Sequence, residues 1–220
     1  MNFLAHLHIA DHCNSHFMGN LLGDFVKGDP SKLYDSDITN GIKLHRFVDR
    51  ITDHHPIVEE CKPHFKGVAR RFAPIALDMF WDHCLAKHWN DFHQESLDDF
   101  VEFAFQKVDQ DVHEPLPARF MLLHQRMWRG GWLQSYQDLS NIEFALHRMS
   151  QRSPRMADLT TTFEVLDGEY AALEANFSEL YQDVLRQSLE FHQQSVHNSI
   201  LWRRGSMAMA ALVNSALQKL

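Results

Sequence analysis

Residues 36–53 read Ser-Asp-Ile-Thr-Asn-Gly-Ile-Lys-Leu-His-Arg-Phe-Val-Asp-Arg-Ile-Thr-Asp, and this stretch decides the fold class. Its apolar residues recur at the 3.6-residue spacing of a helix face, and no proline interrupts the pattern before Pro56. The stretch therefore predicts an amphipathic helix of about five turns.

The same helical spacing continues on both sides of this stretch, and the alternation typical of strands is scarce. Further helices are predicted near residues 2–12, 17–27, 57–71, 74–91, 97–110, 117–129, 141–151 and 167–201. Ser96 with Asp99 and Ser140 with Glu143 are spaced as capping boxes at two of the helix starts. We expect an all-α fold of eight to ten helices in a single domain without internal repeats.

The last residues differ in character from the rest of the chain. Gly205-Ser206-Met207 is a sequence that a cloning junction often leaves, and small apolar residues follow it. We therefore expect a helical domain over residues 1–204 and a cloning-derived tail over 205–220. The alternative is a genuine C-terminal helix.

The composition of the chain argues against two classes of binding partner and indicates the cellular compartment. The chain has 220 residues, 29 Asp and Glu against 21 Lys and Arg, and a net charge of −8. A protein that binds duplex nucleic acid normally has a basic excess, so we expect no nucleic-acid partner. We also expect no membrane partner, because no apolar run approaches the roughly 20 residues that a spanning helix needs. Three cysteines without paired spacing, and no signal peptide, indicate the cytoplasm.

Histidines and carboxylates cluster in the first 90 residues of the chain. His45, Asp49 and Asp53 are four apart and therefore share one helix face. Imidazole suits Mn, Fe, Zn or Ni, and carboxylates suit Mg and Mn, so the mixed set favours Mn or Fe, then Mg, then Zn. The alternative is a solvated face on which Arg46 and Arg50 form salt bridges.

Two further groups of carboxylates lie among apolar residues. Asp78 and Asp82 share a helix face that continues with Leu85, and burying both costs free energy unless cations or a metal compensate them. Asp24 follows Gly23, where a missing side chain allows close approach of the backbone. Asp24 also lies among apolar residues, so it too is expected to need a cation or a metal if it is buried, or it caps a neighbouring helix.

Several spaced motifs together resemble the acyl carrier protein phosphodiesterase family. They are Met-Asn-Phe-Leu-Ala-His-Leu-His at 1–8, Gly-Asn-Leu-Leu-Gly-Asp-Phe-Val-Lys-Gly at 19–28, Gly-Ile-x-Leu-His-Arg-x-Val-Asp-x-x-Thr-Asp-x-His at 41–55, Arg-Arg-Phe at 70–72 and Asp-x-x-x-Asp-His-x-Leu-Ala-x-x-Trp at 78–89. The resemblance is strongest over residues 1–100 and weaker to about 200. It implies a helical fold related to HD-type phosphohydrolases and a Mn²⁺-dependent hydrolase that removes 4′-phosphopantetheine from the serine of holo acyl carrier protein.

The resemblance also implies roles for particular residues. Asp24 is expected to be essential, and His6 completes or borders the site as a second catalytic residue. The metal ligands implied are Asp24, His45, Asp49, Asp82 and His83, with Mn²⁺ as the cation and Fe²⁺ or Mg²⁺ as alternatives. The sequence departs from the wider superfamily in having no His-Asp dipeptide, because Asp82-His83 is reversed.

Cationic residues are expected to bind the substrate. Arg46 and Arg50 are candidates for bidentate binding of phosphoryl oxygens, and they could equally pair with Asp49 and Asp53. Four further cations recur at helical spacing and predict a patch for an acidic carrier protein on an acidic enzyme: Lys62, Lys66, Arg70 and Arg71. The alternative for these four is an ordinary solvated helix face.

Two other functions remain open from the sequence. One is a related metallophosphohydrolase that acts on a small phosphodiester or a nucleotide. The other is a non-catalytic helical binding module in which the histidines and carboxylates are structural. Metal content separates the binding module from both enzymes, and the mass of the carrier protein after incubation separates the two enzymes.

Overall fold

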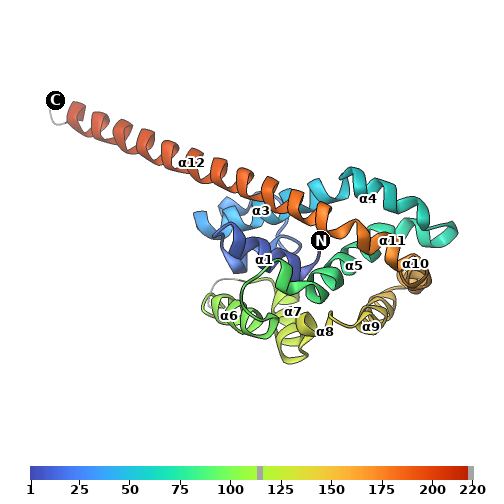
Figure 1. The fold of residues 1–220 in the computed structure, drawn as a ribbon. Coiled ribbons are helices and arrows are strands. Elements are labelled where there is room, and N and C mark those ends of the chain that lie inside the picture. The colour runs from blue at the N-terminus through green and yellow to red at the C-terminus, as the bar shows by residue number, and fades with distance from the viewer. Residues whose placement is uncertain (113–115, 218–220) are drawn as a thin grey trace.

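A computed structural model describes the backbone of residues 1–112 and 116–217, and the side chains of this part through residue 197. All regular secondary structure in the described residues is helical, as expected (Figure 1). The α-helices are α1 (Phe3–His12), α2 (Phe17–Leu22), α3 (Ser36–Asp53), α4 (Pro56–Cys61), α5 (Ala73–Lys87), α6 (Leu97–Asp109), α7 (Ala118–Arg129), α8 (Trp132–Ser135), α9 (Leu139–Ser150), α10 (Thr162–Gly168), α11 (Tyr170–Ala175) and α12 (Phe177–Leu217). The 3₁₀ segments are η1 (Pro30–Lys32), η2 (Lys62–His64), η3 (Gly67–Phe72), η4 (Trp89–Asp91) and η5 (Pro154–Thr161).

The described α-helices outnumber the eight to ten that were expected, because the short helix α8 lies outside every predicted helix and α10 and α11 are separate from α12. Two predicted helices are also divided. The segment 57–71 breaks after Cys61, where Pro63 has no backbone N–H to continue the helix. The pattern over 167–201 is shared among α10, α11 and α12, with a break on either side of α11. The helix predicted over 17–27 ends at Leu22, and a loop follows it.

Helix capping was predicted correctly at one position and wrongly at another. The Ser96 hydroxyl accepts the backbone N–H of Asp99 at 3.1 Å, which confirms the predicted start of α6. The start of α9 does not use Ser140. Asp138 caps that helix by accepting the backbone N–H of Ser140 at 2.9 Å. Asp is as good an N-cap as Ser, so the earlier residue takes the position.

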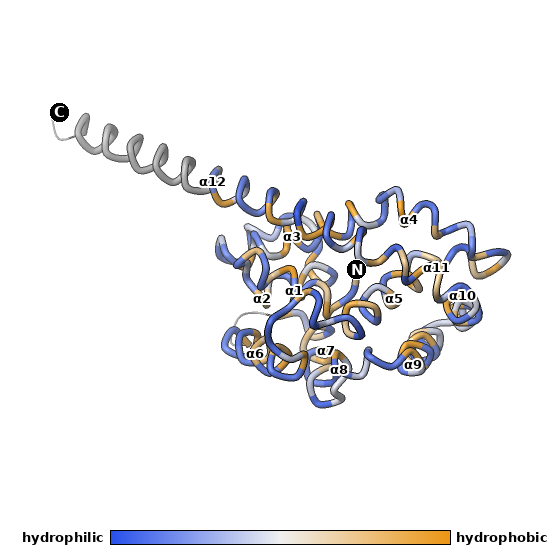
Figure 2. Tube along the Cα trace, viewed as in Figure 1, coloured by the Kyte–Doolittle hydropathy of each residue, from blue (hydrophilic) through white to orange (hydrophobic). Residues whose placement is uncertain are grey.

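Helices α1 and α5 are buried over most of their length and form the centre of the apolar interior, and the first part of α12 packs along α3 (Figure 1). Phe47 of α3 stacks on Phe191 of α12 with ring centroids 4.1 Å apart. Figure 2 shows hydrophobic and hydrophilic positions alternating along α6 and α9, as amphipathic helices around one core require. Trp81 and Tyr181 are among the largest fully buried side chains.

Helix α2 lies unusually close to α3, and two glycines make this approach feasible. A Cβ at Gly19 would lie 2.5 Å from the carbonyl oxygen of Ile38, and one at Gly41 would lie 2.8 Å from that of His16. Because the two backbones nearly touch, the loop that follows α2 is brought onto α3. That loop carries Asp24.

None of the described helices is both long enough and apolar enough to cross a membrane. The predicted division at residue 204 remains a prediction: α12 extends from Phe177 to Leu217, and the side chains of its last part lie outside those that the structure describes.

Candidate metal centre

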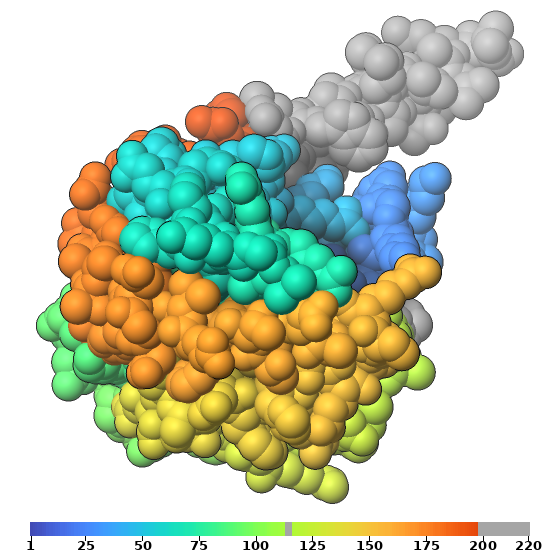
Figure 3. All heavy atoms as spheres, turned by 90° about the vertical axis from the view of Figure 1, so that its right-hand side faces the viewer, coloured from blue at the N-terminus to red at the C-terminus, as the bar shows by residue number. Residues whose placement is uncertain are grey.

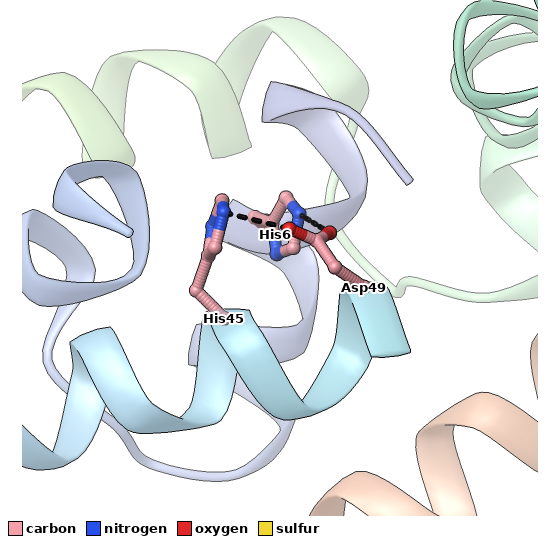
Figure 4. A group of neighbouring side chains, drawn as sticks. All are labelled: His6, His45 and Asp49. Atoms are coloured by element: carbon pink, nitrogen blue, oxygen red, sulfur yellow. Dashed lines mark hydrogen bonds and ion pairs between the residues drawn. The ribbon is translucent and has the colours of Figure 1, made fainter. Parts of the chain in front are cut away.

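Three side chains from two helices converge in the interior between α1 and α3 (Figure 4). His6 comes from the middle of α1, and His45 and Asp49 lie one turn apart on α3. Their ligand atoms all lie within 4.8 Å of one another, and no other group of this kind occurs in the described part of the chain. The helical spacing of His45 and Asp49 was visible in the sequence. The position of His6 beside them results from the packing of α1 against α3.

Asp49 joins the two histidines. One of its carboxylate oxygens lies 3.0 Å from Nε2 of His6, and the other lies 3.0 Å from Nε2 of His45. The two imidazole rings stack with centroids 3.8 Å apart and an interplanar angle of 21°. Both rings are buried, while the side chain of Asp49 is 36% exposed, so the cluster opens to solvent on the side of Asp49.

The hydrogen bond on the far side of His45 orients its ring. Nδ1 of His45 lies 2.7 Å from the backbone carbonyl oxygen of Asn20, and only a protonated Nδ1 can donate to a carbonyl. This leaves Nε2 as the nitrogen that faces the carboxylates. Metal-binding histidines in proteins are commonly oriented by such a hydrogen bond from the other ring nitrogen.

Gly23 creates the space that the His45 ring occupies. A Cβ at this position would lie 1.9 Å from Cδ2 of His45. The sequence indicated a close approach near Asp24, and the structure identifies the imidazole as the group that approaches. The carbonyl of Asn20 was not predicted, because a backbone acceptor leaves no signal in the residue type.

Asp24 lies at the mouth of the cluster. Its carboxylate is 3.5 Å from Nε2 of His45, and its side chain is 61% exposed. Arg46 holds the loop that carries Asp24, because its guanidinium donates to the backbone carbonyl oxygens of Val26 and of Gly28, the latter at 2.8 Å. Asp24 is therefore close enough to join the cluster while remaining accessible to a substrate.

The protonation of the cluster follows from burial and the two carboxylates. Burial, aided by the neighbouring His45, lowers the pKa of His6 to about 4, so this ring is neutral near pH 7. Burial also opposes charge on His45, but hydrogen bonds to Asp24 and Asp49 prevail and raise its pKa to about 9. Partial burial of Asp49 acts against its charge, yet the two histidines lower the pKa of its carboxyl group overall.

These residues fit a divalent cation. Nδ1 of His6 is buried without a hydrogen-bond partner in the described structure, and buried Nε2 of His45 lies 3.0 Å from Asp49 and 3.5 Å from Asp24. Two carboxylates face Nε2 of His45, and a positive charge is needed between them and that nitrogen. In the metal-free protein a proton supplies it, and a cation bound by His6, His45 and Asp49 would replace that proton. The set of two nitrogens and a carboxylate suits Mn²⁺ or Fe²⁺.

Asp82 and His83, which the sequence also suggested as metal ligands, lie outside this cluster. Asp82 is fully buried and accepts the backbone N–H groups of Asn2, Leu4 and Ala5 at 3.1, 2.8 and 3.2 Å. It therefore satisfies the start of α1, the helix that carries His6.

His83 has partners on both ring nitrogens. Nδ1 lies 2.8 Å from the carbonyl oxygen of Tyr136, and Nε2 lies 2.8 Å from the hydroxyl of Tyr170. These contacts tie α5 to the segments around α8 and α11. The structure thus does not bring His83 to the cluster of His6, His45 and Asp49.

The two arginines of α3 do not pair with the carboxylates of that helix in the described structure. Arg46 holds the loop instead. Arg50 is exposed beside the ring of Phe47 and lines a cavity of about 660 Å³ with Glu179 and Asp183.

The four cations of residues 62–71 divide into two pairs. Lys62 donates to the carbonyl oxygen of Asp53 at 2.7 Å and to Glu59 at 2.8 Å. Arg71 donates to the carbonyl oxygen of Arg155 at 2.7 Å and lies 3.6 Å from Asp158. Lys66 and Arg70 are exposed and form no ion pair within the described structure.

A profile of the acyl carrier protein phosphodiesterase family matches residues 1–184 of the chain. The chain belongs to this family. The match includes every residue of the cluster and ends within α12, which confirms the resemblance seen in the sequence motifs. No solved structure matches the chain, so the expected relation to HD-type phosphohydrolases remains a prediction.

Individual members of the acyl carrier protein phosphodiesterase family agree with this assignment. A protein of that name from Enterobacter sp. strain 638 is 40% identical over 189 residues, which are 86% of this chain and 97% of the relative. One from Escherichia coli O157:H7 is 40% identical with the same coverage, and one from Escherichia coli K12 is 39% identical. The chain therefore spans almost the whole length of these family members.

Proposed function

We propose that the chain hydrolyses the phosphodiester that joins 4′-phosphopantetheine to a serine of holo acyl carrier protein. Its family makes it a hydrolase, and the names of its relatives specify acyl carrier protein as the substrate. The observation that supports a metal-dependent reaction is the convergence of His6, His45 and Asp49, with ligand atoms within 4.8 Å of one another. Three free cysteines, all buried, are consistent with action in the reducing cytoplasm.

His6, His45 and Asp49 would hold a divalent cation, Mn²⁺ first, with Fe²⁺ or Mg²⁺ as alternatives. When bound, the cation neutralises phosphoryl oxygens and makes a water molecule more acidic. Asn20 and Gly23 orient the His45 ring, and Asp49 fixes both histidines.

Asp24 is the residue that we propose to orient the attacking water. The hydrogen bond to His45 lowers the pKa of Asp24, so it is a carboxylate at neutral pH and can accept a hydrogen bond from water. Its exposure places it where a substrate can reach it. In the overall reaction the water oxygen bonds to phosphorus and the bond from phosphorus to the serine oxygen breaks. One proton of the water ends on the serine oxygen, which gives apo carrier protein and phosphopantetheine.

The test is mass spectrometry of holo carrier protein after incubation with the chelator-treated protein, with and without Mn²⁺. We expect the carrier to lose the mass of one phosphopantetheinyl group only when Mn²⁺ is present. Asp49→Asn should abolish this loss, while Asp53→Asn, one turn further along α3 and outside the cluster, should retain it. A protein that cleaves a small phosphodiester but leaves the holo carrier intact would refute the proposed substrate.

A further inference from the structure

A short surface segment of this acidic protein contains four cations and no carboxylate. Residues 62–71 contain Lys62, Lys66, Arg70 and Arg71 and no Asp or Glu, whereas the whole chain has a net charge of −8. In Figure 3 the cyan and teal atoms of α4 to η3 form the upper part of the face turned to the viewer, above the orange atoms of residues 160–180. The segment is therefore open to an approaching partner on this face.

The structure separates cations that hold the segment in place from cations that remain free. Lys62 fastens η2 to the end of α3 through Asp53, and Arg71 fastens η3 to η5 through Arg155 and Asp158. Lys66 and Arg70 lie between these two fixed ends, exposed and without an ion pair in the described structure.

An exposed apolar side chain lies between the two free cations. Val68 is 57% exposed and is one of the few large apolar residues at the surface of the described chain. An apolar residue flanked by cations is the composition expected for binding a surface that offers carboxylates around an apolar contact. An exposed apolar side chain does not improve solubility, so Val68 is not explained by a patch that serves solubility alone.

The location of the segment suits a protein substrate of the neighbouring site. Lys62 bonds to Asp53, which is four residues beyond Asp49 and so about 6 Å further along α3. The scissile bond of a holo carrier lies at its own serine, so the carrier surface must contact the enzyme around the metal centre. A protein interface of standard size covers about 800 Å² on each partner, a disc of roughly 16 Å radius. A carrier bound at the cluster would therefore also cover surface past the end of α3, where Lys62 joins η2 to that helix.

We infer that Lys66, Val68 and Arg70 form the docking surface for an acidic face of the protein substrate, with Lys62 and Arg71 as its structural supports. This inference rests on the proposed function, because it assigns a binding surface to that same substrate. Docking through this surface contributes equally to the ground state and the transition state, so its loss raises KM and leaves kcat unchanged. The attraction is between exposed charges and weakens with salt.

The test compares two double variants in the Mn²⁺-loaded full chain with holo carrier protein as substrate. Lys66→Glu with Arg70→Glu should lower kcat/KM at least tenfold through KM, with kcat within about twofold of the unchanged protein, and should flatten the dependence on ionic strength. Val68→Ser should raise KM by a smaller factor. The control is Lys32→Glu with Lys43→Glu, which reverses two exposed lysines elsewhere and should change KM less than twofold.

The outcomes distinguish this inference from the function on which it rests. If the unchanged protein fails to release phosphopantetheine, the proposed function fails and the docking surface fails with it. If the unchanged protein is active and the Lys66–Arg70 variant keeps its KM and salt dependence, only the docking surface is refuted. A rise in KM confined to the Lys32–Lys43 variant would indicate that the carrier binds the surface around Lys32 and Lys43, and it would also overturn the inference.

Discussion

His6 and His45 stack face to face at 3.8 Å, and Asp49 contacts Nε2 of both rings at 3.0 Å. Two buried imidazoles at this separation cannot both carry a positive charge without strong repulsion. The arrangement instead accommodates one positive charge among two histidines and the carboxylates of Asp49 and Asp24. A proton on His45 provides it in the metal-free protein, and a bound divalent cation would provide more.

Gly23→Ala should disable the site while leaving the fold intact. The added Cβ would lie 1.9 Å from the His45 ring, so the ring must move away from the carbonyl of Asn20. We expect activity to fall at least tenfold and stability to fall by about 1–3 kcal/mol, which is typical of overpacking. Kinetics, bound metal and urea unfolding would measure these effects.

The matched control for this substitution is Gly168→Ala. A Cβ at Gly168 would meet no atom within 4 Å, and this residue is the last of α10. The variant should have unchanged activity. Equal activity in the Gly23 and Gly168 variants would contradict the role of Gly23 as the space for His45.

Asp82→Ala should act on stability and not on the number of metal ions bound. Three backbone N–H groups at the start of α1 lose their acceptor, and each buried unsatisfied donor costs about 1–3 kcal/mol. We therefore expect a loss of at least about 2 kcal/mol in urea unfolding. At a temperature where the variant stays folded, it should still bind one Mn²⁺ per chain. Loss of the ion from folded protein would restore Asp82 as a ligand.

The metal-free protein should lose stability as the pH rises above neutrality. Asp24 and Asp49 overcome the effect of burial and raise the pKa of His45 to about 9, above the value of about 6.5 expected in the unfolded chain. A raised histidine pKa means that the folded protein binds the proton more tightly, so the stabilisation is fully present below pH 6.5. It is lost as the pH rises from about 6.5 to 9 and amounts to something on the order of 3 kcal/mol.

Urea unfolding of chelator-treated protein between pH 6 and 10 checks this dependence. His45→Gln should remove the alkaline decline that His45 causes, whatever its effect on stability at pH 6. An equally steep decline in the variant would show that another group is responsible.

Arg46 should affect catalysis by positioning the loop of Asp24 and not by binding phosphate. Its guanidinium is occupied by the carbonyl oxygens of Val26 and Gly28. We expect Arg46→Met to lower kcat about tenfold or more, and to speed hydrogen exchange in residues 23–29, because a loosened carboxylate cannot orient water well. Arg46→Lys should restore part of the lost kcat and part of the protection of residues 23–29 from hydrogen exchange. A raised KM with unchanged exchange would instead indicate direct contact with the substrate phosphate.

The sequence predicted the helical fold and two of the three residues of the cluster for a clear physical reason. Helical periodicity is local, so α3 was predicted with its observed bounds, and with it the shared face of His45 and Asp49. The break after Cys61 was missed although Pro63 marks it, because the apolar periodicity continues across that proline.

The rest of the cluster depends on contacts between distant segments. His6 was grouped with the site only through the family resemblance, and its contact with Asp49 arises from the packing of α1 against α3. Asp82 was grouped with the metal ligands through the family resemblance, and its expected burial called for compensation by cations or a metal. Its compensation comes from three backbone N–H groups of α1, which have no signature in the residue types.

Anomalous diffraction at the Mn absorption edge, from crystals grown with Mn²⁺, tests the metal centre most directly. We predict one strong peak at direct coordination distance from Nε2 of His45, a ring nitrogen of His6 and the carboxylate of Asp49. The peak should disappear in Asp49→Asn crystals. A peak beside Asp82 and His83, or no peak in protein that releases phosphopantetheine, would contradict the assignment of the cluster as the metal site.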